Sequence, residues 1–177
     1  EFILDDLLTV ERRLERLTEE LQKVMRERGA VERDQVLFQR LHAVLSEGQS
    51  LRAQAFTAEE TRLLSGFGLI SRIPMLNLVN QGEGQAMPDL GPADAGTAVL
   101  GLQGKLEMEI AQLAPDEARA FLQEYGIDEP GRQRVIRASY QLLDLISFFT
   151  VGEDEVRAWT LTKGATALEA ADTVHTD

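Results

Sequence analysis

The chain has 177 residues, a formal net charge of −12 and a pI of about 4.6. A negative charge of this size argues against a wide electrostatic footprint on nucleic acid, and we do not expect DNA as a partner. The absence of cysteine excludes disulfides and cysteine-based metal sites and is consistent with a reducing cytoplasm, and no apolar run is long enough to predict a membrane span.

Residues 2–28 are predicted to form one long helix. Apolar side chains at alternating steps of three and four residues form an a/d seam of Leu7, Val10, Leu14, Leu17, Leu21 and Val24. Gly29 is predicted to end this helix, and a second helix is predicted at about 31–46. Its inward side chains are Val31, Leu37, Phe38, Leu41, Val44 and Leu45. Two such helices indicate an antiparallel coiled-coil hairpin, and two helices of an ordinary bundle fit the pattern equally well.

Positive charge is concentrated on this predicted hairpin and its tip. The residues are Arg12, Arg13, Arg16, Lys23, Arg26, Arg28 and Arg33. In an acidic chain these side chains are the best candidates for a contact with RNA or with a ribosomal surface. The pattern by itself favours the alternative, which is the solvated face of a coiled coil.

The middle of the chain carries signals for a short helix followed by a parallel sheet. Thr57 and Glu60 form a capping box, which predicts a helix that runs to about Ser65. The apolar run Ile73–Val79 is typical of a strand that is buried on both faces of a parallel sheet. Ala98–Leu102 is the second candidate for a buried strand, after a loop rich in glycine, proline and alanine.

Two polar residues, Asn80 and Glu83, stand at the carboxyl end of the first predicted strand. In open α/β sheets, ligands bind just outside the carboxyl ends of the strands. A carboxamide can donate to and accept from a purine edge, and a carboxylate can accept from ring or exocyclic N–H groups. The Asn-x-x-acid spacing therefore suggests base recognition in a nucleotide-binding G domain. The alternative is a polar turn in which Asn80 caps and Gly82 and Gly84 supply positive φ.

Four helices and a β-hairpin are predicted in the last 75 residues. The first helix follows Gln103-Gly104-Lys105, and the next two begin near Pro115 and Pro130. The side chains predicted to face inward include Phe121, Tyr125, Ile136 and Leu143. The hairpin is predicted over 147–161, with Trp159 as a core residue, and a last helix begins near Thr166.

Several segments together resemble the Obg-like ATPase family, the YchF group of P-loop NTPases. These segments are Phe2–Leu17, the stretch Pro74–Glu83 with its Asn-x-x-Glu, Arg134–Gly152, and Glu155–Ala167 with His175–Asp177. The resemblance covers essentially the whole chain. Because the sequence opens within a helical pattern and stops soon after another, we expect it to be an internal fragment.

The resemblance implies a parent protein that binds and hydrolyses ATP with Mg²⁺ in the cytoplasm and acts with the ribosome and its rRNA. The implied fold class is α/β with a helical coiled-coil hairpin insertion. The implied parts are the coiled-coil arm over 1–64, the C-terminal part of a P-loop (Rossmann-like) G domain over 65–146, and the first hairpin and helix of a TGS β-grasp domain over 147–177. Asn80 and Glu83 match the family's base-reading fourth motif, and Gln103 and Gly104 match its fifth.

Two departures from the family pattern leave the choice between ATP and GTP open. Gln81 and Gly82 differ from the commoner residues inside the fourth motif, and the fifth motif is loosely matched. The chain contains no G-x-x-x-x-G-K-[ST] stretch, so we expect no catalytic or metal-binding residue within it. The phosphate-binding residues and Mg²⁺ ligands are expected upstream of Glu1, and the fragment itself is expected to be inactive. The alternative is a non-enzymatic coiled-coil module that binds a protein or ribosomal partner.

Overall fold

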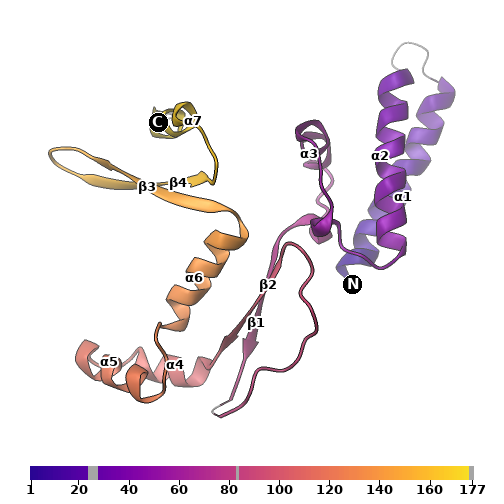
Figure 1. Ribbon diagram of the computed structural model, residues 1–177. Helices are drawn as coiled ribbons and strands as arrows, with labels where there is room; N and C mark the ends of the chain where they lie inside the picture. Colours follow the sequence, from indigo (N-terminus) through magenta and orange to yellow (C-terminus); the bar gives the residue numbers. More distant parts are fainter. Residues whose placement is uncertain (24–27, 83, 176–177) are drawn as a thin grey trace. The chain divides into compact units, whose positions relative to one another are not determined.

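The computed structural model describes residues 1–23, 28–82 and 84–175 (Figure 1). The chain divides into two compact units, which are described separately. The first consists of Glu1–Pro74 with Asp94–Gly96, and the second of Met75–Ala93 with Thr97–Asp177. No helix within the described ranges combines the length and the hydropathy that a membrane crossing requires.

The first unit is helical. Its elements are α1 (Phe2–Lys23), α2 (Arg28–Ser46), the 3-10 turn η1 (Leu51–Ala53), α3 (Ala58–Leu64) and the 3-10 turn η2 (Ile70–Arg72). Helices α1 and α2 lie side by side and antiparallel (Figure 1). The prediction that Gly29 ends the first helix is wrong, because Gly29 lies in the first turn of α2.

The main cluster of buried hydrophobic side chains among the described residues lies in this first unit. Its members are Val10, Leu17, Leu37, Phe38, Leu41, Leu45, Leu51, Leu64 and Leu69. The inward faces predicted for the first two helices are therefore confirmed where they are described, whereas Val24 lies outside the described residues. The rings of Phe38 and Phe67 meet edge to face, with their centroids 4.8 Å apart. Whether the two helices continue as a true coiled coil stays a prediction.

The predicted capping box is confirmed at the start of α3. The Glu60 N–H donates to Thr57 Oγ1 over 3.2 Å, and the Thr57 N–H donates to Glu60 Oε2 over 2.8 Å. A second box, which the sequence analysis missed, begins α7. There the Thr166 N–H donates to Glu169 Oε2 over 2.6 Å, and the Glu169 N–H donates to Thr166 Oγ1 over 3.3 Å. The Thr-x-x-Glu spacing was the available signal.

The second unit contains two small sheets and four helices among its described residues. Its elements are β1 (Met75–Asn80), β2 (Thr97–Leu102), α4 (Gly104–Ile110), α5 (Pro115–Glu124), α6 (Gly131–Leu142), β3 (Leu145–Val151), β4 (Val156–Thr162) and α7 (Ala167–His175). Strands β1 and β2 pair in parallel, and β3 and β4 form an antiparallel hairpin, as the sequence predicts. Asp144 adopts a φ of 50° where the chain turns from α6 into β3.

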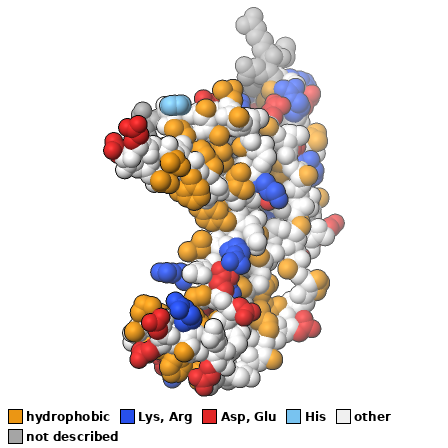
Figure 2. Space-filling view, turned by 60° about the vertical axis from the view of Figure 1, so that its left-hand side comes forward, with side chains coloured by type: hydrophobic (Ala, Val, Ile, Leu, Met, Phe, Trp, Pro, Cys, Tyr) orange, Lys and Arg blue, Asp and Glu red, His pale blue; other side chains and the backbone are white. Residues whose placement is uncertain are grey.

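The predicted burial of the second unit is only partly confirmed, because Ile110 of α4 is 5% exposed but most of the other predicted positions are not buried. Leu78 of β1 is 50% exposed, and no residue of β1 or β2 is fully buried. Phe121, Tyr125, Ile136 and Leu143 are also exposed. Each sheet has two strands in the described part of the chain, so too few layers are present to cover these faces. Figure 2 shows hydrophobic side chains at the surface over the β3–β4 hairpin.

Trp159 is half-buried rather than a core residue. Its Nε1–H donates to Thr150 Oγ1 on the facing strand over 2.9 Å. The guanidinium carbon of Arg157 lies 4.9 Å from the centroid of the indole ring. The indole is therefore held by a hydrogen bond and a cation–π contact within the hairpin rather than by an apolar core.

Candidate nucleotide-base site

The carboxyl ends of β1 and β2 lie side by side. The two strands are parallel and in register, so Asn80 at the end of β1 is opposite Leu102 at the end of β2. The Gln81 N–H continues the pairing by donating to the Leu102 carbonyl over 2.7 Å. This topology brings the segment after β1 next to Gln103 and Gly104, which follow β2.

Asn80 contacts the start of α4 directly. Its Oδ1 accepts a hydrogen bond from the Gly104 N–H over 3.1 Å. That N–H belongs to the first residue of the helix, where backbone donors have no intrahelical partner. A Cβ at position 104 would lie 2.9 Å from Asn80 Oδ1, so glycine permits the close approach. The bond fixes the carboxamide plane of the exposed Asn80 side chain and leaves its NH₂ group as a donor.

Of the two predicted base-site residues that remain, the structure describes Gln103 but not Glu83. Gln103 is half-buried and immediately precedes α4. Glu83 lies outside the described residues. Beside it in sequence, Gly82 donates its N–H to Gln85 Oε1 over 2.9 Å, and the Gln81 side chain donates to the Gln85 carbonyl over 3.3 Å. The loop after β1 is thus closed by Gln85, which the sequence analysis did not single out.

A cavity of about 390 Å³ lies against this end of the sheet. The residues that line it include Gln81, Gln103, Tyr125, Asp128 and Arg134. Its volume falls within the range of about 300–1,000 Å³ that is usual for small-molecule sites. The cavity is therefore large enough for a ligand of nucleoside size.

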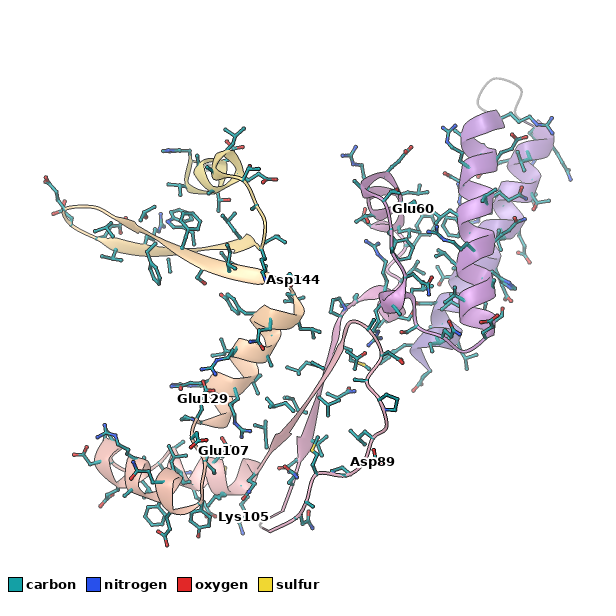
Figure 3. The ribbon with its side chains drawn as sticks, viewed as in Figure 1. Glu60, Asp89, Lys105, Glu107, Glu129 and Asp144 are labelled. Atoms are coloured by element: carbon teal, nitrogen blue, oxygen red, sulfur yellow. The ribbon has the colours of Figure 1, made fainter. Side chains whose placement is uncertain are left out.

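An ion pair between α4 and α6 closes the same region, and the sequence analysis missed both partners. Arg134 Nη2 donates to Glu107 Oε1 over 2.8 Å, and Arg134 Nη1 donates to the Gly101 carbonyl over 3.0 Å. Glu107 Oε2 also accepts from the N–H of Gly131, the first residue of α6. Figure 3 labels Glu107 where α4 and α6 approach each other. No local spacing marks the pair, because its members are 27 residues apart.

The predicted basic set is partly neutralised by carboxylates. Arg13 lies 2.8 Å from Glu20 and 3.6 Å from Asp34, measured between nitrogen and oxygen. The corresponding distances are 3.7 Å for Lys23–Glu19 and 3.0 Å for Arg28–Glu32. Arg12, Arg16 and Arg33 are exposed, and Arg26 lies outside the described residues.

The chain's residues do not by themselves fit an Mg²⁺-phosphate group. The sequence has no glycine-rich G-x-x-x-x-G-K-[ST] stretch to surround phosphates with backbone N–H groups. Within the described ranges, no three histidine or acidic side chains are grouped as metal ligands. The arrangement at the ends of β1 and β2 presents the Asn80 NH₂ group as a hydrogen-bond donor, and no phosphoryl-transfer step is assigned to it.

Comparison with known proteins gives consistent matches. A family model named YchF-GTPase_C, described as a protein of unknown function (DUF933), matches residues 145–177. The ribosome-binding ATPase YchF of Bacillus subtilis (strain 168) is 35% identical over 187 residues, which cover 100% of this chain and 50% of that protein. The protein of the same name from Haemophilus influenzae is 34% identical over 184 residues, with the same coverage.

A solved structure extends the likeness to the fold. The structure of the Schizosaccharomyces pombe YchF GTPase matches with a TM-score of 0.80 and 25% identity, over 100% of this chain and 50% of that one. The chain thus has a fold of mixed helix and sheet that is shared with a GTPase. More narrowly, the chain belongs to the YchF family. It spans about half the length of the curated relatives it matches.

Proposed function

We propose that this chain is part of an Obg-like P-loop NTPase that binds and hydrolyses ATP, with Mg²⁺, in the cytoplasm and acts with the ribosome. The observation that carries the proposal is the hydrogen bond from the Gly104 N–H to Asn80 Oδ1. It joins the fourth and fifth motifs that the family resemblance implies, although they are 24 residues apart. The names of the relatives, which are ribosome-binding ATPases, support the same assignment.

In this proposal the chain supplies base recognition. The NH₂ group of Asn80 donates to an acceptor on the purine edge, Glu83 accepts from the base, and backbone near Gln103 and Gly104 approaches the ring. Glutamate is one methylene longer than the aspartate of ordinary GTPases, and it would crowd the arrangement that accepts two guanine N–H groups. ATP is therefore the proposed substrate and GTP the competitor.

We also propose that the chain in isolation is inactive. A few hydrogen bonds to a base contribute only about 1 kcal/mol each, which is far below what micromolar affinity requires. Phosphate contacts and Mg²⁺ ligands would come from the remainder of the parent protein. The helical hairpin would act as a coiled-coil arm, and the β3–β4 hairpin with α7 would open a TGS domain.

Titration calorimetry on the parent chain, extended upstream through its G domain, tests the base-reading role. We expect Mg·ATP to bind more tightly than Mg·GTP, and Asn80→Ala to weaken ATP binding about tenfold, equivalent to about 1.4 kcal/mol. Asn77→Ala is the matched control, because Asn77 lies within β1 rather than at its carboxyl end. Absence of binding for both nucleotides would refute the enzyme assignment.

A non-enzymatic interaction module is the second candidate function. Arg12, Arg16 and Arg33 are exposed on the helical hairpin, and none has a carboxylate partner among the described residues. Arg12 and Arg16 lie four residues apart on α1 and therefore share one face. This function would be the better account if neither nucleotide bound while Arg12→Glu with Arg16→Glu abolished co-sedimentation with ribosomes.

A further inference from the structure

We propose that Arg134, together with Glu107, positions the base-reading turn between β2 and α4. This inference rests on the proposed function, since it concerns the same site. Arg134 touches neither motif of that site directly, so it is a positioning residue rather than a catalytic one.

The two bonds of Arg134 bracket the turn that carries Gln103 and Gly104. One bond ends on the Gly101 carbonyl, two residues before Gln103, and the other ends on Glu107, three residues after Gly104. A planar guanidinium holds its N–H groups in a fixed fork. The spacing between the end of β2 and the first turn of α4 is therefore set by one rigid group.

Helix α6 in turn is fixed to the same carboxylate. Glu107 Oε2 accepts from the Gly131 N–H at the start of α6, where an acceptor satisfies one of the unpaired helix donors. Gly131 is buried, and a Cβ there would lie 2.7 Å from Leu102 Cδ2. Glycine at this position thus lets α6 approach the last residue of β2 and keeps Arg134 within reach of both acceptors.

The Glu107–Arg134 pair is more buried than the neighbouring Arg137–Glu129 pair. The side chain of Glu107 is 13% exposed and that of Arg134 is 29% exposed. In the neighbouring pair on α6, Arg137 is 65% exposed although its nitrogen lies only 2.7 Å from Glu129. Solvent screens exposed pairs strongly, so the Glu107–Arg134 pair holds its geometry better than the Arg137–Glu129 pair does.

The test compares a ligand that has a base with one that has none. Calorimetry on the full-length protein would measure the affinities of Mg·ATP and of inorganic tripolyphosphate for wild type and for Arg134→Gln. We expect Arg134→Gln to weaken ATP binding about five- to tenfold, the effect of about one hydrogen bond, and to leave tripolyphosphate binding unchanged within about twofold. Arg137→Gln, one turn further along α6, should change neither affinity.

Arg134→Lys provides the conservative variant and guards against a loss of folding. Lysine keeps the charge but cannot reach both acceptors with a fixed fork, so ATP binding should fall by about threefold. An equal loss for ATP and tripolyphosphate would show that the pair only stabilises the fold, and it would overturn the inference. Unchanged ATP binding in both variants would also overturn it.

Asn80→Ala, measured in parallel, separates this inference from the function on which it rests. A selective loss of ATP binding in Asn80→Ala without one in the Arg134 variants would refute the positioning role alone. If Asn80→Ala and the Arg134 variants all weaken the binding of ATP and of tripolyphosphate to the same extent, the base site itself is refuted. We expect Asn80→Ala and the Arg134 variants each to lose ATP affinity selectively. In the double variant the loss should be smaller than the sum of the two single losses.

Discussion

Asp6 is the residue whose replacement tests the packing of the helical unit most directly. Its side chain is 3% exposed, although it lies in the first turns of α1. Oδ1 accepts from the Ile70 N–H over 2.9 Å, and Oδ2 accepts from the Ser71 N–H over 2.7 Å. The carboxylate thus joins the start of the chain to η2, 64 and 65 residues away.

The size of the effect follows from these two bonds. Each hydrogen bond to a charged group contributes about 1.5–3 kcal/mol, and removal of a buried charge returns part of its desolvation cost. Asp6→Ala should therefore lower the free energy of unfolding by about 2–4 kcal/mol. Asp6→Asn keeps one acceptor oxygen and replaces the other with a donor, so about half of that loss is expected.

Urea unfolding followed by far-ultraviolet circular dichroism would measure this change. With an m-value of about 2 kcal/mol/M, Asp6→Ala should lower the midpoint by about 1–2 M, and the Ile70 and Ser71 amides should lose protection against hydrogen exchange. Asp5→Ala is the control, because Asp5 is exposed on the same helix turn and should cost less than about 1 kcal/mol. Equal effects of the two substitutions would refute the reasoning.

Two further predictions concern the same unit. Phe38→Ala should lower the free energy of unfolding by about 3–5 kcal/mol, because Phe38 is fully buried against Phe67. Val36→Ala, at a 67% exposed position of α2, should change the urea midpoint little. Similar losses of stability in the two variants would contradict the assignment of the core. The Thr57 N–H lowers the pKa of Glu60 from its ordinary value of 4.5, so the stability that this carboxylate contributes is present above that value and is lost as the pH falls through the lowered pKa. The difference in urea midpoint between wild type and Glu60→Gln should vanish in acid, with Glu59→Gln as the control, and a difference that is independent of pH would refute the role of the box.

The parts of the fold that could be predicted from sequence depend on short-range signals. The capping box at Thr57 and Glu60 spans three residues, and the seam of α1 repeats every three or four. The apolar run before Asn80 predicted a strand in a parallel pair, and the structure contains it. The proximity of Asn80 to Gly104 was also accessible, because parallel strands end at a common edge.

Burial could not be predicted in the same way, because it depends on how many layers are stacked. The apolar run Ile73–Val79 has the composition of a strand covered on both faces, yet Leu78 is half exposed. The same holds for Phe121 and Ile136 on the helices of the second unit. Periodicity identifies which side of an element is apolar, but the covering layer is supplied by other segments, whose number a local pattern does not contain.

The residues that hold the elements together are hidden for a different reason. Asp6 and Arg134 each use one charged side chain to hold backbone groups that are 64 or 33 residues away. In the sequence Asp6 is one of two adjacent aspartates, and Arg134 is one of several arginines on an amphipathic helix. A charge on a helix is usually solvated, so a local pattern assigns both residues to the surface. Because each of these side chains bonds to a backbone group, and almost every residue carries the same backbone groups, no residue type marks the bonding partner in the sequence. Such side-chain-to-backbone bonds therefore escape motif reasoning even where, as we propose for the turn between β2 and α4, they set the geometry of a motif.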